Sequence, residues 1–207
     1  MSSPEAPMSF GKRYAILNLD WMTVLLAACE GTSQGTRLVD NLSKWHEAIH
    51  QMNERPLTVY TTLAFNRGQP ELEAGKPFAR LIESFGTFEV GTPSAEIDKR
   101  FQLDEKDVVL RKTRWCATTG NNLEQILKAQ GIDTVIISGL TLSGVVMSTV
   151  YRLFDLDYNI FVIADNVLEI PLDHNTVFSK VMLEDLLPKM NLKVISLEQA
   201  LQALNEA

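Results

Sequence analysis

Two charged side chains end apolar runs at positions where an enzyme could use them for acid–base chemistry. Asp20 closes the run YAILNLD (14–20), and Lys112 closes the run DVVLRK (107–112). A carboxylate at a dry strand end is unfavourable unless it is paired, and a nearby ammonium would hold it ionised and attract an anion. We therefore predict that Asp20 is a catalytic acid or base and that Lys112 is its partner. The alternatives are that Asp20 caps a helix and that Lys112 is solvated.

A third candidate is the stretch SGLTLSGVVMST (138–149), an apolar strand followed by a short polar turn and a helix. Free amides at the start of such a helix can hold an oxyanion. Ser143 is expected to cap this helix or to contact a substrate. The alternative is a plain connection in which a glycine allows close packing. The backbone groups of the candidate oxyanion site belong to Leu140, Thr141, Gly144 and Val145.

Residues beside these positions are candidates for binding a substrate. The guanidinium group of Arg114 can bind a carboxylate through two parallel hydrogen bonds. The large apolar side chains could line a pocket for a flat or cyclic molecule, or could equally belong to the core. Cys116 is the thiol nearest to the predicted site, although a free cysteine is more often a small buried apolar residue. The complete set is Trp21, Met22, Phe65, Arg114, Trp115, Cys116 and Ser143.

Strands and helices alternate along the chain. Short apolar runs predict strands, and apolar residues at helical spacing predict helices between them. This alternation predicts a three-layer α/β/α fold with a six-stranded parallel sheet, whose ligands bind at the carboxyl ends of the strands. The long segment 66–105 carries one short helix near 76–85. The expected strands are 14–20, 57–65, 107–112, 133–139, 159–165 and 192–196, and the expected longer helices are 35–54, 121–131, one after residue 142, 173–188 and 197–204.

The composition predicts an acidic protein with one domain. The chain has 207 residues and a formal net charge of −7, so we expect a flexible arm at 1–12 and a single domain at 13–207. The acidic balance argues against nucleic acid as a partner, and no apolar run is long enough for a membrane span. Two cysteines and no secretory leader indicate a cytoplasmic location.

His46 and His50 lie four residues apart on an expected helix, where a solvated helix face is favoured over half of a metal site.

Asp20, Lys112 and the 138–149 turn, in this order on this strand pattern, resemble the isochorismatase-like (cysteine hydrolase) superfamily. The motifs are AILNLD, KTRWCATTGNNLEQIL and GLTLSGVVMSTVYRLFDLDYNIFVIADNV. The resemblance implies a homodimer or homotetramer and a non-proline cis peptide at Leu140–Thr141. It places Val145 where that family carries its cysteine nucleophile. The family's metal-binding Asp-x-His loop is absent, so the resemblance implies neither a metal nor a cofactor.

Valine cannot form an acyl-enzyme, so the resemblance points to relatives that lack the cysteine. SGVVMST, DLDY and FEVGTPSAEI (88–97) resemble such a group, to which no firm activity belongs. True isochorismatases also lack this cysteine and cleave a vinyl ether with water. We therefore predict a hydrolase for a small anionic cyclic substrate, with Asp20 as general acid and with Lys112 and Arg114 binding carboxylates. The alternative is a catalytically silent binding or scaffolding protein.

Overall fold

Six strands form one parallel sheet in the computed structural model, which describes residues 8–206. The strand order is β3-β2-β1-β4-β5-β6, so the winding reverses between β1 and β4. Ligands of such doubly wound sheets bind at the carboxyl ends of the strands near this reversal. The strands are β1 (Tyr14–Leu19), β2 (Leu57–Leu63), β3 (Asp107–Lys112), β4 (Thr134–Leu140), β5 (Asn159–Leu168) and β6 (Lys193–Ile195).

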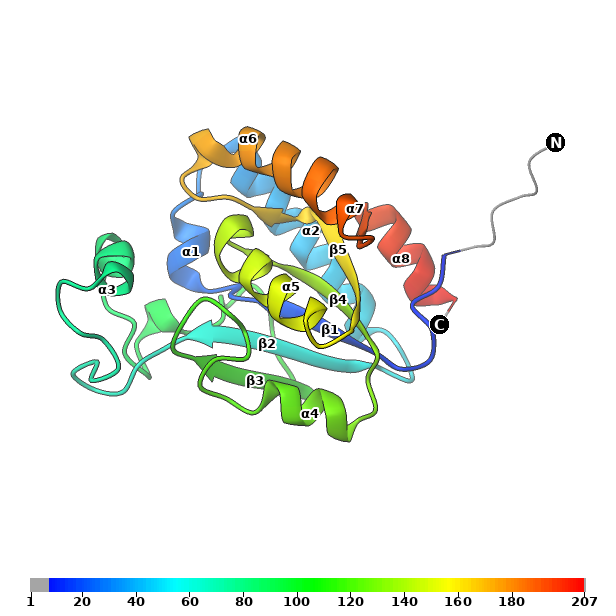
Figure 1. Cartoon of the computed structure of the whole chain (residues 1–207), viewed down its shortest axis with the longest axis horizontal. Helices are drawn as coiled ribbons and strands as arrows, with labels where there is room; N and C mark the ends of the chain where they lie inside the picture. The colour runs from blue at the N-terminus through cyan, green and yellow to red at the C-terminus, as the bar shows by residue number, and fades with distance from the viewer. Residues whose placement is uncertain (1–7, 207) are drawn as a thin grey trace.

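Helices cover both faces of this sheet (Figure 1). They are α1 (Thr23–Ala27), α2 (Ser33–His50), α3 (Pro77–Ile82), α4 (Leu123–Ala129), α5 (Met147–Phe154), α6 (Asn175–Ser179), α7 (Leu187–Lys189) and α8 (Leu197–Asn205). One buried cluster joins the sheet to α1, α2 and α8 through residues such as Leu42 and Trp45. A second cluster joins it to α4, α5 and α7 through residues such as Leu127 and Val150. The predicted three-layer α/β/α fold is confirmed.

Short helical turns complete the structure. Three are 3-10 turns, η1 (Glu83–Phe85), η2 (Pro93–Ala95) and η4 (Leu172–His174), and two are π-helical, η3 (Leu142–Val146) and η5 (Lys180–Leu186). The expected helix at 173–188 is therefore built from α6, η5 and α7 in succession. A π turn at η3 directly precedes α5, and such turns often occur at functional sites.

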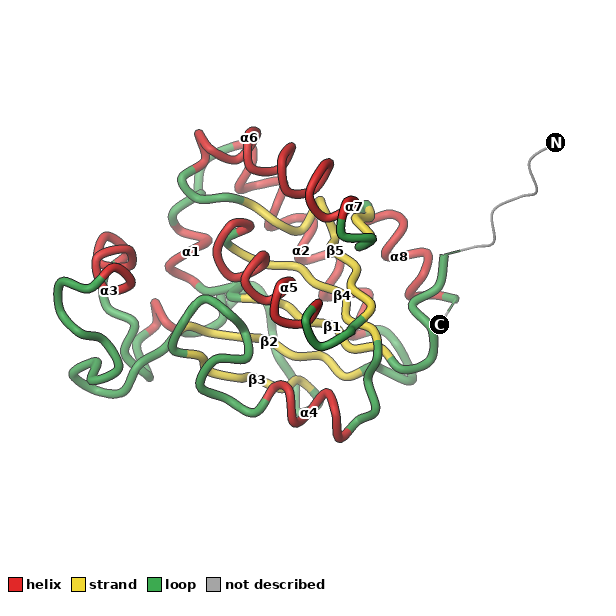
Figure 2. Tube along the Cα trace, viewed as in Figure 1, coloured by secondary structure: helices red, strands yellow, loops and turns green. Residues whose placement is uncertain are grey.

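The segment between β2 and β3 is mostly loop (Figure 2), and α3 within it lies beyond the carboxyl ends of these strands (Figure 1). Two isolated bridges hold it near the strand ends, one between Met22 after β1 and Ile97, and one within the segment between Phe65 and Glu89. Its Phe88 is 2% exposed and belongs to the core. The long segment therefore packs over the strand ends.

The structure departs from the expected elements at three places. β5 continues past Asp165 to Leu168, because its register with β4 shifts between Ile137 and Gly139. The helix α1 follows β1 almost directly and was not predicted. Of the expected flexible arm, residues 1–7 lie outside the described residues, but Phe10 is 2% exposed and packs against Tyr14 and Phe161. Within residues 8–206, no helix combines the length and apolarity that crossing a bilayer requires.

Candidate active site

Asp20 and Lys112 form a buried ion pair at the carboxyl edge of the sheet. Lys112 Nζ lies 2.7 Å from Asp20 Oδ2, and the two side chains are 0% and 5% exposed. β2 lies between their two strands, so the residues stand about 10 Å apart across the sheet, and a lysine side chain can bridge much of that separation. The ammonium also donates to the Arg114 carbonyl oxygen at 3.0 Å. The sheet order thus joins two charges that are 92 positions apart in the chain.

The backbone around Asp20 orients its carboxylate. Asp20 has a φ of 55°, a left-handed conformation that aspartate adopts more readily than most residues. Its amide donates to the Thr61 carbonyl oxygen at 3.1 Å, and the Thr61 hydroxyl donates to Asp20 Oδ1 at 2.7 Å. On the other side, a Cβ at Gly139 would collide with the Leu19 carbonyl oxygen, so only glycine lets β4 approach this turn.

Burial raises the pKa of Asp20 above its ordinary value. The Lys112 ammonium and the hydrogen bonds from Lys112 and Thr61 act in the opposite direction but do not cancel the burial. A carboxyl group with a raised pKa holds its proton more readily than an exposed aspartate does, as a general acid requires.

The turn after β4 presents Ser143 to a second buried carboxylate. The peptide bond between Leu140 and Thr141 is cis, as the resemblance implied. Ser143 donates its amide to Glu169 Oε2 at 2.7 Å and its hydroxyl to Glu169 Oε1 at 2.9 Å. The expected capping role of Ser143 is therefore wrong, since the residue lies inside η3 and its hydroxyl is bonded to Glu169. Val146 donates its amide to the Thr141 carbonyl oxygen at 3.2 Å and closes the turn.

A cavity of about 220 Å³ opens between these elements. Most of its wall is apolar, and the segment between β2 and β3 contributes Leu81, Ile82, Phe85 and Phe88. Val145 is 1% exposed and lines the same cavity as Asp20, at the position that the resemblance assigns to a nucleophile. The predicted site residues on the wall are Asp20, Met22, Trp115, Leu140, Thr141, Ser143 and Val145.

Gly144 lies behind this wall, where space is tight. A Cβ there would stand 2.6 Å from Thr141 Oγ1 and 3.2 Å from the Trp115 ring. Among the described residues, Gly144 and Lys112 do not line the cavity. Both act on it through neighbours: Gly144 lets Trp115 approach the turn, and Lys112 contacts Asp20.

Four predicted binding residues lie elsewhere among the described residues. Trp21 is fully buried in the core, with its ring 4.7 Å from that of Phe101. Phe65 is also fully buried, and its amide donates to the Phe88 carbonyl oxygen. Both side chains therefore belong to the core, which was the alternative to a pocket role.

Arg114 and Cys116 also point away from the cavity. The Arg114 guanidinium lies 5.1 Å from the centre of the Phe78 ring and donates to the Glu71 carbonyl oxygen at 3.0 Å. It therefore anchors the long segment, and it is not placed to bind a substrate carboxylate in the cavity. The Cys116 thiol lies 3.4 Å from the Thr118 hydroxyl.

Glu169 is the charged cavity residue that sequence reasoning missed. The strand prediction ended at Asp165, but the Asp165 carboxylate instead accepts the amide of Leu197, the first residue of α8, at 2.7 Å. Glu169 follows the extended β5 and is only 4% exposed. The available signal was an acid directly after the apolar residues Val167 and Leu168, which repeats the pattern that drew attention to Asp20.

Among the described residues, one cluster has side chains of the types that bind metals, but an arginine forms ion pairs with its carboxylates. His50, Asp104 and Asp107 lie within 4.8 Å of one another. Arg55 donates to both oxygens of Asp104 at 2.9 and 2.5 Å, which places a cation where a metal would bind. His46 is buried, with Nδ1 2.8 Å from the Tyr60 hydroxyl, so the expected solvated helix face is wrong for this residue.

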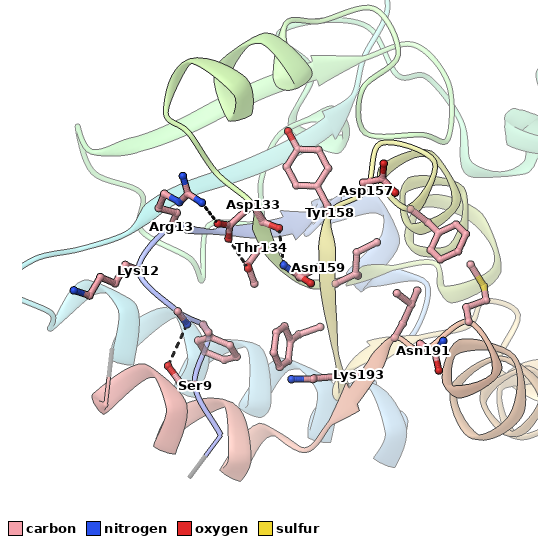
Figure 3. A pocket seen from close by; sticks show the side chains of 17 residues that line it. Ser9, Lys12, Arg13, Asp133, Thr134, Asp157, Tyr158, Asn159, Asn191 and Lys193 are labelled. Atoms are coloured by element: carbon pink, nitrogen blue, oxygen red, sulfur yellow. Dashed lines mark hydrogen bonds and ion pairs between the residues drawn. The ribbon is translucent and has the colours of Figure 1, made fainter. Parts of the chain in front are cut away.

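A second hollow, of about 650 Å³, lies at the amino ends of the strands (Figure 3). Two of its charged groups pair with one another, since Arg13 lies 2.7 Å from Asp133. Thr134 donates its hydroxyl to the same carboxylate at 2.8 Å. Because ligands of parallel sheets bind at the opposite edge, we place the candidate active site at the cavity beside Asp20.

Glu169→Gln is expected to flatten the pH dependence of the free energy of unfolding. Burial raises the pKa of Glu169, and the hydrogen bonds from Ser143 offset this only in part. A raised folded-state pKa gives stability that is fully present below about pH 4.3 and is lost as the pH rises through the folded pKa. The wild type should therefore lose stability relative to the variant as the pH rises above about 4.3, which urea unfolding at a series of pH values measures.

The exposed Glu184 provides the control for this experiment. Glu184→Gln removes the same charge from the surface of η5 and should leave the pH dependence close to that of the wild type. A difference between wild type and Glu169→Gln that stays constant with pH would contradict the effect of burial on Glu169.

The fold and this site define an α/β protein of the hydrolase type, with an acidic residue and a lysine at the carboxyl edge of a parallel sheet. The chain belongs to the isochorismatase family, because the model of the isochorismatase domain matches residues 14–199.

Individual relatives agree with this assignment. The chain is 25% identical over 155 residues to YwoC, an uncharacterized isochorismatase family protein of Bacillus subtilis, with 72% of this chain and 79% of that protein covered. It is 43% identical over 56 residues to an N-carbamoylsarcosine amidase of an Arthrobacter species, a match that spans 27% of this chain and only 21% of the amidase. An isochorismatase family protein of Burkholderia thailandensis has a similar structure, with a TM-score of 0.77, 17% identity, and coverage of 97% of this chain and 100% of that one.

Proposed function

We propose that this protein is a hydrolase that adds water to a small cyclic substrate without a thiol nucleophile. The observation that carries the proposal is the buried Asp20–Lys112 pair, whose carboxylate lines the same cavity as Val145. A valine offers no nucleophile, whereas the carboxyl group can transfer a proton. The geometry therefore favours a reaction that needs an acid and a water molecule.

Hydrolysis of a vinyl ether meets these requirements. Asp20 protonates the terminal carbon of the double bond, and a water molecule attacks the resulting oxocarbenium carbon. The hemiketal then breaks into a ketone and an alcohol, and the proton that the water lost returns to Asp20. Lys112 stabilises the carboxylate after it has given up its proton. The Ser143 and Val146 amides already donate to Glu169 and Thr141, so the amides of Gly144 and Val145 are the first-turn groups that would polarise an oxygen of the substrate.

The anionic substrate expected from the sequence is not part of this proposal. That expectation depended on Lys112 and Arg114 as binding groups. The Lys112 ammonium is held by Asp20 and by a backbone carbonyl, and Arg114 is held by Phe78 and Glu71. Neither cation is free to meet a carboxylate in the cavity.

We expect hydrolysis to survive alkylation of Cys116, which is partly exposed, whereas Cys29 is buried. Neither Cys29 nor Cys116 is among the cavity residues of the described chain, so iodoacetamide should leave turnover within about twofold of the untreated value. The measurement is turnover on a panel of cyclic vinyl ethers and amides before and after treatment, with alkylation followed by mass spectrometry. Loss of turnover in step with alkylation of Cys116 would contradict a mechanism without a thiol.

A second candidate is a catalytically silent binding protein. It is favoured by Val145, which fills the nucleophile position with an apolar side chain that is 1% exposed. No turnover of any member of the panel, by a protein that still binds small ligands in this cavity, would favour this function over the first.

A further inference from the structure

The charged groups on the cavity wall are both acids. In the described chain these are Asp20 and Glu169, and the other lining residues are uncharged, most of them apolar. An apolar wall with few polar groups is typical of a small-molecule site in which those groups decide the orientation and chemistry of the ligand. The two carboxylates are therefore the features that a ligand must match.

The two acids differ in how their charges are balanced. The Lys112 ammonium lies 2.7 Å from Asp20 and compensates its charge inside the protein. Within residues 8–206, no ion pair joins Glu169 to a lysine, arginine or histidine. Its carboxylate accepts hydrogen bonds from the amide and hydroxyl of Ser143, and the Ile170 amide and the more distant His174 also lower its pKa. A buried carboxylate without a cation is unfavourable, so a ligand that brings a positive charge or a strong donor would be favoured.

The Glu169 carboxylate is also fixed in position. Each of its oxygens accepts one hydrogen bond from Ser143, and its own amide donates to Asn175 Oδ1 at 2.9 Å. A carboxylate has about four acceptor sites, and because Ser143 uses two and the Ile170 amide also bonds to this carboxylate, about one remains for a ligand. The side chain is held before any ligand arrives, which lowers the entropy lost on binding.

The size of the cavity limits the ligand to about one ring. An apolar cavity of about 150 Å³ can hold benzene. The volume here is about 220 Å³, which leaves room for a small substituent on such a ring. The rings of Phe85, Phe88 and Trp115 on the wall suit an apolar ligand body.

We propose that Glu169 determines specificity and that the cavity selects a single-ring ligand carrying an ammonium or amide N–H donor. The ligand lies in the site of the proposed hydrolase, so calling it a substrate rests on the proposed function. The donor group meets Glu169, while the ring fills the apolar volume near Trp115.

The test compares two probes of nearly equal shape and opposite charge, benzylammonium and benzoate. Binding to the wild type is followed by NMR at pH 7.5, with the Trp115 indole N–H signal reporting occupation of this cavity. We expect benzylammonium to bind at least tenfold more tightly than benzoate. Equal affinity, a preference for benzoate, or no binding of either probe would overturn the proposal, and this arm needs no variant.

Glu169→Gln then assigns the preference to one side chain. The variant keeps the shape of the residue and should reduce the preference to about threefold or less, while the surface control Glu184→Gln should keep that of the wild type. A preference retained in Glu169→Gln would overturn the role of Glu169. Binding is measured independently of turnover, so the two proposals can fail separately. If the protein hydrolyses its substrate but prefers benzoate, only this inference is refuted. If it prefers benzylammonium but shows no turnover, only the proposed hydrolysis is refuted.

Discussion

Asp20→Asn is expected to lower turnover by about two to four orders of magnitude, the range typical of losing a positioned acid or base. The asparagine has nearly the same shape and can still accept the Thr61 hydroxyl, which now donates to Asp20 Oδ1 at 2.7 Å. It cannot transfer a proton. The measurement is turnover of a substrate found with the vinyl ether and amide panel, at a temperature well below the melting point of the variant.

The matched control is Asp157→Asn. Asp157 also has a left-handed backbone, with a φ of 62°, but it lines the hollow at the opposite edge of the sheet. The same substitution there should change turnover by less than about twofold. Equal turnover in wild type and Asp20→Asn would exclude the acid–base role of Asp20 and leave Lys112 without a carboxylate to stabilise in the reaction.

The alternation of apolar runs was sufficient to predict the sheet. β3 has the bounds expected from its sequence, and the strand order then brings Lys112 and Asp20 together. Local patterns could not predict the extension of β5, because it depends on a register shift against β4 between Ile137 and Gly139. This extension moves the carboxyl end of the strand from Asp165 to Leu168, and so brings Glu169 to the cavity.

The aromatic candidates show a second limit of the sequence. Trp21 and Trp115 each lie within three residues of a charged residue of the ion pair, and the sequence around them did not distinguish a core role from a pocket role. Trp21 turns into the face covered by α2, beside Phe101, whereas Trp115 remains 39% exposed next to Gly144. The choice depends on how the segment 66–105 packs, and that is a property of the tertiary structure.

Lys112→Met is expected to lower the free energy of unfolding by about 3–5 kcal/mol at neutral pH, because it leaves a buried carboxylate without its partner. Methionine keeps most of the length of the side chain, so the apolar packing is largely preserved. Without the ammonium, burial raises the pKa of Asp20 further, and the carboxyl group is protonated more easily. A raised folded-state pKa gives stability at low pH that is lost as the pH rises, so the loss should shrink towards pH 4. Urea unfolding at several pH values measures both effects.

Two further variants separate the ion pair from the loss of a lysine. The exposed Lys128→Met should change the free energy of unfolding by no more than about 0.5 kcal/mol. The double variant Asp20→Asn/Lys112→Met removes both charges, so it should be less destabilised than the sum of the single variants, with a coupling of about 1–3 kcal/mol. Additive effects would mean that the 2.7 Å contact contributes little to stability. In that case the two buried charges would be explained by their role in the reaction alone. The turnover of Lys112→Met would then be the deciding measurement.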